Sequence, residues 1–492
     1  MASAHRGHRI SGSLRERTID NPAMTPRADP VLERLPALDG TAPADAADAF
    51  RDLPGLGVLE SARPGRAGRW SFLVAEPVAV VDGSVPGADP FAAARAALRR
   101  LDPSRLPVGA PPFAGGLVGH LAYDLGRRLE RLPARAVDDQ GLPDLRLGLH
   151  AWSIAWDGRD GRAWLAGRAV DGDAAALTTV LASVRARAQA AVRVPLRGEP
   201  AFPRLAFRSE IEQAAWMGRV EAVRAAIAAG ELYQANLTRR LVAAFDGDPW
   251  AVFRRLRVGE PAAFTAYLDL GRHPDAGTRR AIVSASPEPF LALDAGGLVR
   301  TDPVKGTRPR GATRAEDRAL AAELLASEKD RAENTMIVDV LRNDLGRVCV
   351  PGSVRVPRLW RLERTPSVQH LVSTVTGRLA PGRDAFDLLA ASFPGGSITG
   401  APKIRAMELL ESLEPVRRGP YCGTALWVDA GGAMGSSVLI RTFVADGRRL
   451  TLHVGGGITW RSDPAAEWEE TRTKARGPLR AIGATVEGEE DT

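Results

Sequence analysis

The chain has few cysteines, no long apolar run and almost no lysine. Two cysteines among 492 residues cannot form a disulfide framework and are typical of a reducing compartment, so we expect a cytoplasmic protein. No stretch approaches about 18 uncharged apolar residues, which excludes a transmembrane helix. The N-terminus lacks the apolar core of a signal peptide. No Cys/His cluster of the zinc-binding kind is present.

Lysine is scarce: only four of the 66 basic residues are lysines, namely Lys305, Lys329, Lys403 and Lys474. Arginine therefore serves wherever any positive charge suffices, and a retained lysine is a candidate for chemistry that arginine cannot perform. Arginine keeps its proton near neutral pH, whereas a desolvated lysine can be a nucleophile. Lys305 is the most suggestive of the four, because Pro303, Gly306 and two arginines surround it. The alternative is an ordinary surface lysine.

The net charge of +7 raises nucleic-acid binding as a rival class of function. The arginines, however, are spread along the chain and mixed with acids, and aromatic residues make up only 5%. We therefore expect a solvated, arginine-rich surface and no nucleic-acid partner.

The chain is long enough for two or three domains or one large enzyme body. Residues 1–30 read as a polar arm, in which Met24 opens a sequence more like a natural start. Residues 31–190 form an N-terminal region that ends in a predicted helix over 174–191. A proline-rich stretch over 193–204 is a plausible linker. Residues 205–485 form the second region, with the sharper pattern of elements.

In the second region, Ser209 and Glu212 predict a capping box for a helix that Gly230 ends. Residues 233–241 alternate like a strand, with Tyr233, Ala235 and Leu237 on one face. Further strands are predicted at 281–294, 352–357, 371–379, 422–429, 437–445 and 449–454, and helices at 314–326, 328–345, 384–392, 401–413 and 464–480. These elements show no regular βαβ alternation, so the fold class is mixed α+β.

Two pairs of carboxylates lie on predicted helices. Asp330 and Glu333 share a side with the apolar stripe that includes Ile337. Glu467 and Glu470 follow Asp463, which can cap their helix. Carboxylates directed at a core are costly unless a cation relieves the charge, and four of them suit Mg²⁺. For either pair alone, a solvated acidic face is the better interpretation; together they favour the metal.

Several weaker signals accompany the acids. The small residues of 393–400 lead into a helix and can offer backbone N–H groups to an anion. At Gly455 and Gly457 the lack of a side chain leaves the backbone open to a neighbouring group. The Arg441 guanidinium can form two hydrogen bonds to a carboxylate. His370 lies at a predicted strand start, where an isolated histidine is more often structural than catalytic.

Together these residues resemble the chorismate-utilising enzymes: component I of anthranilate and aminodeoxychorismate synthases, and the isochorismate and salicylate synthases. In order and spacing the matching motifs cover 205–480. They are Gly230–Asn236, Ser286–Phe290, Pro303–Arg310, Ala332–Asp339, Arg342–Gly346, Gly400–Lys403 and the Glu467/Glu470 helix. Leu59-Glu-Ser61 and Arg69–Phe72 match more loosely. The resemblance implies an anthranilate/aminodeoxychorismate synthase-type fold, with two stacked antiparallel-rich sheets enclosed by helices and the N-terminal region contributing strands.

The resemblance also implies roles for site residues. Glu333 and Glu470 would hold Mg²⁺ against the ring carboxylate of chorismate, with Asp330 and Glu467 helping. His370 would lie beside the ring, and Glu288 would protonate the departing hydroxyl. The remaining substrate contacts would come from Gln234, Thr307, Ser397, Tyr421, Arg441, Gly455, Gly457 and Lys474. Leu426-Trp427 departs from the family's usual Gly-aromatic pair, which is expected to reshape the wall beside Tyr421.

Two positions discriminate within the family. Gln234 stands where the water-activating branch has lysine, and glutamine cannot be a general base, which favours ammonia over water. Anthranilate synthases usually have alanine at position 305, so Lys305 resembles aminodeoxychorismate synthase, in which the lysine attacks chorismate covalently. We expect desolvation, or Arg308 and Arg310, to lower the pKa of Lys305.

The expected function is therefore aminodeoxychorismate synthase component I, which makes 4-amino-4-deoxychorismate for 4-aminobenzoate and folate or for a secondary metabolite. Neither Cys349 nor Cys422 fits a glutaminase nucleophile elbow, so a separate glutamine amidotransferase subunit would supply ammonia. Tryptophan is a candidate ligand of the N-terminal region, near Leu59-Glu-Ser61. The alternatives are anthranilate synthase component I and a catalytically silent partner on this fold.

Overall fold

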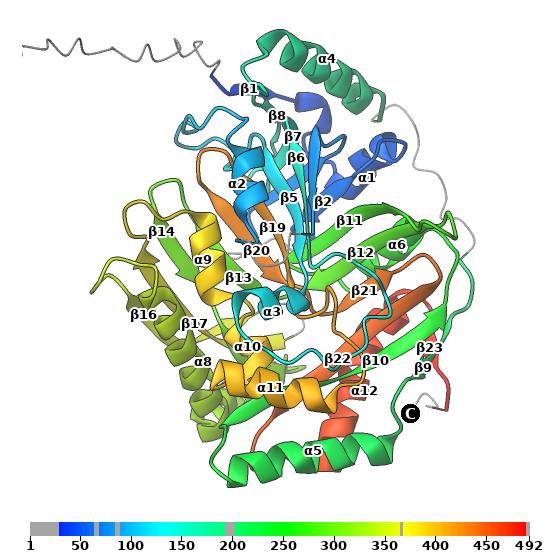
Figure 1. Cartoon of the computed structure of the whole chain (residues 1–492), viewed down its shortest axis with the longest axis vertical. Helices are drawn as coiled ribbons and strands as arrows, with labels where there is room; N and C mark the ends of the chain where they lie inside the picture. The colour runs from blue at the N-terminus through cyan, green and yellow to red at the C-terminus, as the bar shows by residue number, and fades with distance from the viewer. Residues whose placement is uncertain (1–28, 63–67, 84–88, 192–201, 365–367, 489–492) are drawn as a thin grey trace, which may run out of the picture.

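The computed structural model describes residues 29–62, 68–83, 89–191, 202–364 and 368–488. Within these residues the strands form two large, almost wholly antiparallel sheets (Figure 1). The arm over 1–30 and the linker over 193–204 lie largely outside the described residues. None of the helices in the described ranges has the length and apolar character needed to cross a membrane.

The first sheet has 13 strands among the described residues. Their order is β1 (Val31–Arg34), β8 (Ala163–Gly167), β7 (Trp152–Asp157), β3 (Trp70–Val74), β2 (Gly57–Glu60), β11 (Phe264–Arg272), β12 (Arg279–Ser286), β21 (Thr442–Ala445), β22 (Arg449–Ile458), β10 (Gln234–Ala244), β9 (Ala206–Ser209) and β23 (Thr485–Val486), with β18 (Gly400–Ala401) beside β10. Strands from the N-terminal and C-terminal halves thus share one sheet.

The second sheet has 10 strands among the described residues. Their order is β15 (Val304–Pro309), β17 (Val368–Arg378), β14 (Leu298–Thr301), β13 (Pro289–Leu293), β20 (Met434–Val438), β19 (Thr424–Asp429), β5 (Gly116–Leu121), β6 (Leu145–His150) and β4 (Ala79–Asp82), with β16 (Arg355–Arg364) beside β17. Here too strands from both halves of the chain pair with each other.

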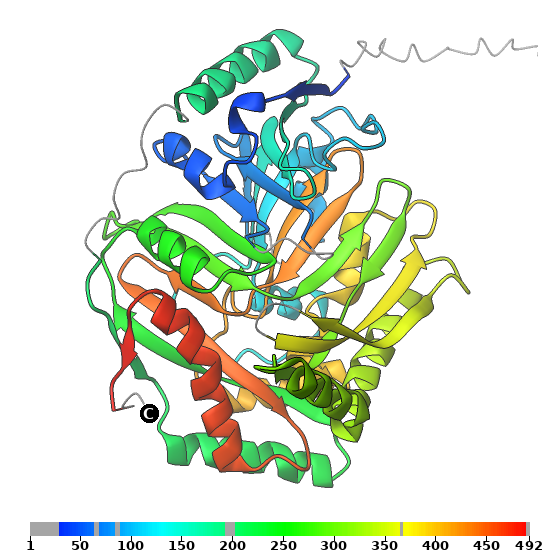
Figure 2. The same cartoon turned by 180° about the vertical axis from the view of Figure 1, so that it is seen from behind.

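Helices cover the outer faces of the two sheets, and a third core lies between them. α1 (Pro43–Ala47), α4 (Ala174–Ala191), α6 (Pro249–Gly259) and α12 (Pro464–Ala481) pack on the first sheet. α2 (Ala92–Leu98), α8 (Glu328–Gly346) and α9 (Ala385–Ser392) pack on the second. Phe72, Val118 and Ile282 belong to the core between the sheets. Figure 2 shows α12 (red) lying on its sheet, with α5 (Gln213–Ala228) across its end. The predicted fold class is confirmed.

The helices agree closely with the sequence prediction because their capping signals are local. α7 (Arg314–Ala326) begins after Thr313, whose hydroxyl accepts the Glu316 N–H. α12 begins after Asp463, which caps it as predicted, with Pro464 in its first turn. The capping box at α5 is wrong, however. Glu212 is itself the N-cap residue, and the Ser209 hydroxyl donates to the Ile211 carbonyl.

Four strand predictions need correction. The strand predicted at 352–357 lies further along the chain, as β16. Residues 281–294 hold two strands, β12 and β13, which lie in different sheets, and residues 437–445 likewise hold β20 and β21. A run of β-forming residues does not reveal where the chain leaves one sheet for the other. At β10, the side chain of Tyr233 is 74% exposed and precedes the strand, whereas Ala235 and Leu237 are buried.

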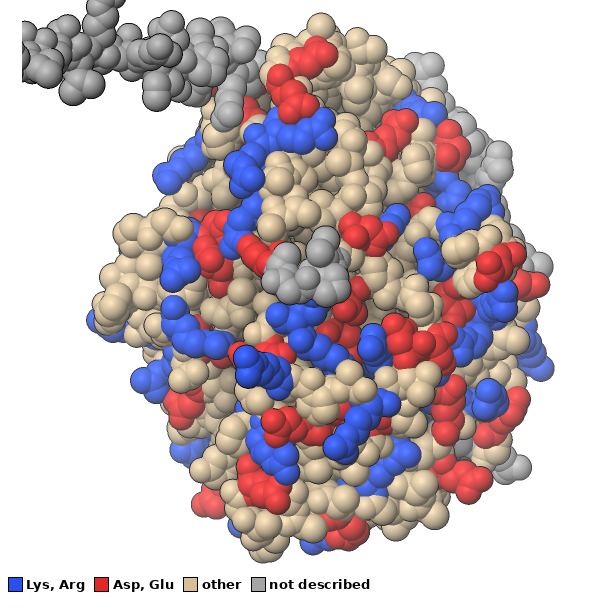
Figure 3. Space-filling model, in the orientation of Figure 1, with Lys and Arg blue, Asp and Glu red and all other residues tan. Residues whose placement is uncertain are grey.

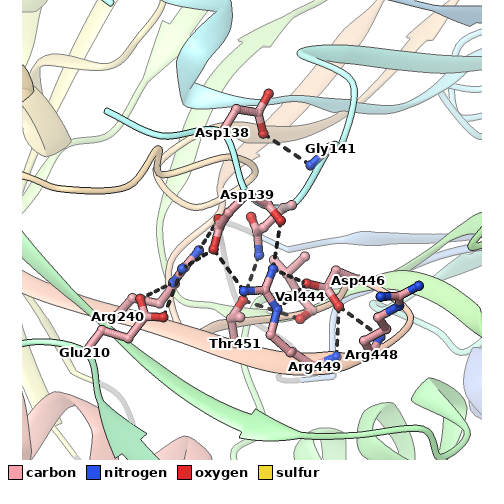
Figure 4. Close-up of polar contacts among 11 residues, drawn as sticks. Asp138, Asp139, Gly141, Glu210, Arg240, Val444, Asp446, Arg448, Arg449 and Thr451 are labelled. Atoms are coloured by element: carbon pink, nitrogen blue, oxygen red, sulfur yellow. Dashed lines mark hydrogen bonds and ion pairs between the residues drawn. The ribbon is translucent and has the colours of Figure 1, made fainter. Parts of the chain in front are cut away.

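A loop from the N-terminal half is fastened to the first sheet by one carboxylate (Figure 4). Asp139 accepts hydrogen bonds from Arg240 on β10 and from Arg449 on β22, at 2.6–2.9 Å. Although partial burial acts against the charged form, these arginines lower the pKa of Asp139 to about 2. Such pairs recur over the surface, where Figure 3 shows basic and acidic side chains intermixed.

Two histidines are fully buried in the second sheet. His120 lies on β5 and His150 on β6, and Nδ1 of His150 is 3.1 Å from the Ala75 carbonyl oxygen. Burial lowers the pKa of each imidazole to about 4, from an ordinary value of 6.5. Both rings are therefore neutral in the folded protein at neutral pH. The unfolded chain binds protons more readily than the folded chain between these two values.

We predict that the protein loses stability as the pH falls from 6.5 towards 4, by up to about 3 kcal/mol for each histidine. Replacing His120 by Asn should reduce the slope of unfolding free energy against pH in this window by the contribution of one proton. Urea denaturation at several pH values measures that slope. Leu147→Ala is the control, since it removes packing but no titrating group. An unchanged slope in His120→Asn would contradict the prediction.

Candidate active site

Two crossovers between the sheets lie side by side and carry Glu288 and Arg441. Residues 286–289 link β12 to β13, and residues 438–442 link β20 to β21. The Val438 N–H donates to the Glu288 carbonyl at 3.1 Å, and the Ala285 N–H donates to the Arg441 carbonyl at 3.1 Å. Each crossover therefore holds the other in place, which positions the Glu288 backbone where the two sheets meet.

The surroundings of Glu288 shift its carboxyl towards the protonated form. Burial raises the pKa of Glu288, although a hydrogen bond from Ser397 and the positive charges of Lys305 and Lys474 act in the opposite direction. Ser397 lies on α10 (Gly396–Thr399), the short helix that precedes α11 (Lys403–Leu413). A carboxylic acid kept protonated beside a possible leaving group can serve as a general acid.

Lys305 lies on β15, half-buried, beside Glu288 and the other acids. Its strand bulges at Gly306, which has φ = +80°, and a Cβ on that residue would lie 2.9 Å from the Cβ of Asp330. Burial lowers the pKa of Lys305, and Lys474 adds repulsion, while Glu333, Glu288 and Glu470 oppose the shift. The neutral amine is thus favoured relative to a free lysine.

The two arginines after Lys305 do not contribute to that shift as expected. Arg308 pairs with Glu323 at 2.8 Å and with Asp330 at 3.2 Å. Arg310 pairs with Asp317 at 2.6 Å. Both arginines are neutralised by carboxylates, so desolvation is the main cause of the lowered pKa.

Thr307 and His370 face each other across neighbouring strands. They form a cross-strand pair between β15 and β17, and the Thr307 hydroxyl lies 2.9 Å from His370 Nδ1. This contact orients the imidazole two residues along β15 from Lys305. The strand pairing places His370 next to Leu371, the cross-strand partner of Lys305, a proximity that the sequence spacing of 65 residues does not reveal.

The second acid pair lies over a glycine of β22. A Cβ on Gly456 would be 3.2 Å from both Glu467 Oε2 and Glu470 Oε1, so a larger residue there would press on the two carboxylates. Burial raises the pKa of Glu467, against a 2.6 Å hydrogen bond from Ser462. Although burial alone would raise the pKa of Glu470, its 2.6 Å ion pair with Lys474 holds it below the usual value. Lys474 also donates to the Gly455 carbonyl at 2.8 Å.

The two acids of the first pair, Glu333 and Asp330, have different surroundings. Burial raises the pKa of Glu333, and the nearby Asp330 and Glu470 act in the same direction, whereas Lys305 and Lys329 oppose. The charges of Lys305 and Glu470 therefore both act on the pKa of Glu333. Asp330 instead pairs with Arg308, and its charge is already balanced.

The donor set fits a hard divalent cation, although the acids are not drawn together around one point. Among the described residues, no three His, Cys, Asp or Glu side chains are gathered in that way. Lysines supply the balancing charge: Lys474 pairs with Glu470, and Lys329 Nζ is 4.0 Å from Glu333. Glu333, Glu467 and Glu470 are oxygen ligands of the kind that Mg²⁺ prefers, and a cation would take over this compensation.

Gln234 and Asn236 extend the group on β10. Gln234 donates to Asn236 Oδ1 at 3.2 Å, and the Asn236 amide donates to the Ser397 carbonyl. A Cβ on Gly457 would lie 2.1 Å from Gln234 Nε2, which explains that glycine. Gln234 Oε1 is buried and has no hydrogen-bond partner among the described residues. Asn236 was missed by the sequence reasoning, although strand alternation places it on the face of Gln234.

Tyr421 and Arg441 are placed less directly. Tyr421 is buried, and its ring stacks on His453, two residues before Gly455, with centroids 5.0 Å apart. Burial raises the pKa of Tyr421. Arg441 has a left-handed backbone, φ = +50°, and its guanidinium pairs with Glu260 at the end of α6.

Three of the four lysines surround the acids, in keeping with their selective retention. Lys305, Lys329 and Lys474 each influence the pKa of Glu333 or Glu467. Lys403, the fourth, has a different task. It bonds Asp344 at 2.8 Å and the Ser392 carbonyl at 2.9 Å, which ties α11 to α8 and α9.

Two larger pockets are lined by residues other than Lys305 and the acids of the site. One, of about 1030 Å³, lies along another face of α8 and is lined by Tyr233, Met336 and Trp360. The other, of about 570 Å³, is lined by Leu59, Glu60 and Ser61, where the sequence suggests a tryptophan site. Trp427 lines this second pocket and packs on Phe72 at 5.4 Å, while Leu426 is buried in the core. Trp427 therefore shapes this pocket, whereas Leu426 lies in the same core cluster as Tyr421, so the expected effect on the wall beside Tyr421 stays a prediction.

The fold and site bring together a partly desolvated lysine, an acid whose pKa burial raises, and carboxylates suited to a divalent cation. A family model described as chorismate binding enzyme matches residues 60–480. The chain belongs to this family and is a chorismate-utilising enzyme.

Named relatives fall in two branches of the family. The chain is 42% identical to aminodeoxychorismate synthase component 1 of Salmonella typhimurium over 371 residues, 75% of this chain and 77% of that protein. It is 40% identical to anthranilate synthase component 1 of Mycobacterium tuberculosis over 466 residues, 89% and 90% of the two chains. The crystal structure of anthranilate synthase component I from Streptococcus pneumoniae matches with a TM-score of 0.73 at 29% identity, covering 85% of this chain and 93% of that one.

We predict that Lys305 reacts with an amine-acylating reagent at a lower pH than Lys329, because only the neutral amine is nucleophilic and burial lowers the pKa of Lys305. Competitive labelling followed by peptide mass spectrometry measures this directly, since the chain has only four lysines. Glu333→Gln removes a negative charge that favours the ammonium form and should move the labelling of Lys305 to still lower pH. A reversed order of Lys305 and Lys329 would contradict the prediction.

Proposed function

We propose that the protein is aminodeoxychorismate synthase component I, which converts chorismate and ammonia to 4-amino-4-deoxychorismate. The observation that carries the proposal is that Lys305 and Glu288 share one partly desolvated site: burial lowers the pKa of the lysine and raises that of the acid, and each charge acts on the other. Both groups are thereby favoured in their neutral forms, as a nucleophile and a general acid require. The relatives in the aminodeoxychorismate synthase branch support the same reading.

The proposed reaction has two displacements. The Lys305 amine forms a bond to C2 of chorismate while the two ring double bonds shift, from C1=C2 to C1=C6 and from C5=C6 to C4=C5, and the C4–O bond breaks. Glu288 gives its proton to the departing hydroxyl, which leaves as water. Ammonia then forms a bond to C4, the two double bonds shift back to C1=C2 and C5=C6, and the C2–N bond to Lys305 breaks to release the neutral amine. The Glu288 carboxylate accepts the surplus proton from the new ammonium group. The amine thus arrives on the face that the hydroxyl left.

The other site residues hold the substrate. Ser397 steadies the Glu288 carboxyl by its hydrogen bond. The Thr307–His370 pair lies beside the reacting ring, and the backbone of Gly455 and Gly457 lies close to a carboxylate of chorismate. Tyr421, Arg441 and Lys474 complete the anion-binding side.

Mg²⁺ is the proposed cofactor, held by Glu333, Glu467 and Glu470, with Asp330 at the periphery through Arg308. When bound, it would supply positive charge against the ring carboxylate of chorismate. The acids lie beside Lys305, so the same cation would reduce their pull on the lysine proton and favour the neutral amine.

Ammonia is proposed to come from a separate glutaminase subunit. Both cysteines are buried, and burial raises the pKa of the thiol at Cys349 and at Cys422, to about 12 for the latter. Neither thiol is suited to the nucleophilic attack that glutamine hydrolysis needs. Gln234, which has no basic nitrogen, is consistent with ammonia as the incoming group.

The alternative is anthranilate synthase component I, which relatives of about equal identity support. In that case ammonia would attack C2 directly, and pyruvate would be lost to leave anthranilate. Lys305 distinguishes the two proposals, because direct attack needs no amine from the protein.

We predict that wild-type protein mixed with chorismate in the absence of ammonia forms a chorismate-derived adduct at Lys305. Intact-protein mass spectrometry after rapid quenching, followed by peptide mapping, detects it. With ammonium and Mg²⁺ the product should be 4-amino-4-deoxychorismate, whereas glutamine should support turnover only when a glutaminase is added. Lys305→Arg keeps the charge but cannot attack, so it should lose both the adduct and the product.

Lys305→Ala is the informative comparison, since it leaves space for ammonia to attack C2 and should divert the product towards anthranilate. Two results together would reject covalent catalysis: no adduct at Lys305, and aminodeoxychorismate formed by Lys305→Arg at the wild-type rate. Anthranilate as the main wild-type product would instead establish the alternative.

We predict that Glu470→Gln and Glu333→Gln each lower turnover by at least about a hundredfold and weaken Mg²⁺ binding, because each removes an anionic oxygen ligand. Calorimetric titration with Mg²⁺ and turnover at increasing Mg²⁺ measure the two effects. Glu469→Gln, on the solvent side of the same helix, is the matched control and should leave both unchanged. Wild-type turnover by either variant at modest Mg²⁺ would refute the assignment.

A further inference from the structure

One fully buried ion pair, Arg418 with Glu414, lies directly behind the candidate active site. The Arg418 guanidinium donates to both oxygens of Glu414, at 2.8 and 2.7 Å, and lies 4.4 Å above the ring of Tyr123. The side chains of the pair are only 1% and 9% exposed. Burying two charges is costly unless their hydrogen bonds are complete, so such a pair needs an explanation.

The remaining hydrogen bonds of the pair go to the backbone of two site segments. Arg418 donates to the Asn236 carbonyl on β10 at 2.6 Å and to the Ile398 carbonyl on α10 at 3.0 Å. Glu414 accepts from the Thr238 N–H at 3.0 Å and from its hydroxyl at 2.9 Å. The pair therefore clamps β10 to α10.

The clamped segments bracket the contact that presents Ser397 to Glu288. Ile398 follows Ser397 directly, and the Asn236 side chain donates to the Ser397 carbonyl. On the other side, Asn236 and Thr238 are the cross-strand partners of Gly457 and Gly455. A shift of β10 against α10 would thus move the Ser397 hydroxyl relative to the Glu288 carboxyl.

We propose that Arg418 and Glu414 are positioning residues of the reaction, which hold the Ser397 hydroxyl against the Glu288 general acid. They touch neither substrate nor reacting atoms and act through α10. The inference rests on the proposed function, in which Glu288 protonates the leaving hydroxyl. A guanidinium is suited to this task because its planar fork can bond a carboxylate and two carbonyls at fixed angles, which a lysine ammonium cannot do.

The polar groups that face Glu288 define the measurable consequence. They are Ser397 on α10, Lys305 on β15 and Lys474 on α12. The clamp bonds directly to the segments that flank Ser397, whereas it reaches Lys474 only through the Gly455 carbonyl on the strand paired with Thr238. Loss of the Ser397 hydrogen bond removes an influence that lowers the pKa of Glu288, so the alkaline limb of the rate profile should move to higher pH while the rate falls.

A second buried pair provides a matched control. Arg168 donates to Asp429 at 2.8 Å and to the carbonyls of Asp102 and Ser104 at 2.7 and 2.9 Å. Its side chain is 0% exposed. The bonding pattern is that of Arg418, with one carboxylate and two backbone carbonyls, but none of these partners belongs to the site. Arg168→Lys should therefore cost stability without changing the chemistry.

The experiment compares Arg418→Lys, Glu414→Gln, Ser397→Ala and Arg168→Lys in the full chain, with chorismate, Mg²⁺ and ammonium. We expect Arg418→Lys to lower kcat about ten- to a hundredfold with KM for chorismate within about threefold, as for partial loss of general acid catalysis. Its alkaline limb should shift in the same direction as that of Ser397→Ala. In the double variant Arg418→Lys/Ser397→Ala, the loss should be close to that of Ser397→Ala alone, because both act through one contact.

The outcomes separate this inference from the function on which it rests. No turnover of chorismate by the wild type would reject the proposed function itself. Wild-type turnover, together with an Arg418→Lys variant that matches Arg168→Lys in kcat and pH profile, would reject only the positioning role; so would additive losses in the double variant. If Arg418→Lys does not fold, Glu414→Gln gives the same comparison. Failure of both to fold, with Arg168→Lys folded, would also overturn the proposal.

Discussion

Partial desolvation of opposite charges is the constraint on which the site depends. Burial penalises the charged form of an acid and of an amine alike, so it raises the pKa of Glu288 and lowers that of Lys305. A single physical cause thereby brings both groups towards the neutral forms that their proposed roles require. Attraction between the charged forms of Lys305 and Glu288 opposes these pKa shifts. The other carboxylates of the site have countercharges of their own, since Lys329 lies near Glu333 and Lys474 pairs with Glu470.

The fold supplies that environment at the point where the chain changes sheets. Glu288 and Arg441 lie on adjacent crossovers that hydrogen-bond to each other, and Lys305 lies on an outer strand of the second sheet. The acids Glu467 and Glu470 come from a helix on the first sheet, and Glu333 from a helix on the second. The site is thus assembled between two layers, neither of which contains enough of it to act alone. Buried arginines such as Arg418 hydrogen-bond segments of the site to each other.

The similarity to both anthranilate and aminodeoxychorismate synthases has a physical reading. The two reactions share a substrate and the chemistry of a departing hydroxyl, so the acid, the carboxylates and the glycine strand can be common to both. In the proposed function they differ in whether the protein contributes an amine, which would come from Lys305. Overall identity of about 40% to each branch does not distinguish them.

The sequence by itself determined the helices and the set of side chains able to take part in catalysis. Caps such as Thr313 and Asp463 act within one turn, and lysine scarcity and acid spacing are readable without a fold. Only the tertiary structure decided how these parts meet. The strand runs over 281–294 and 437–445 each divide between two sheets, Arg441 pairs with Glu260, and Arg308 with Glu323 and Asp330. Asn236 meets Ser397 across 161 positions, and Arg418 meets Asn236 across 182. Such contacts depend on how the sheets stack, and no local pattern of residues encodes a partner at that distance.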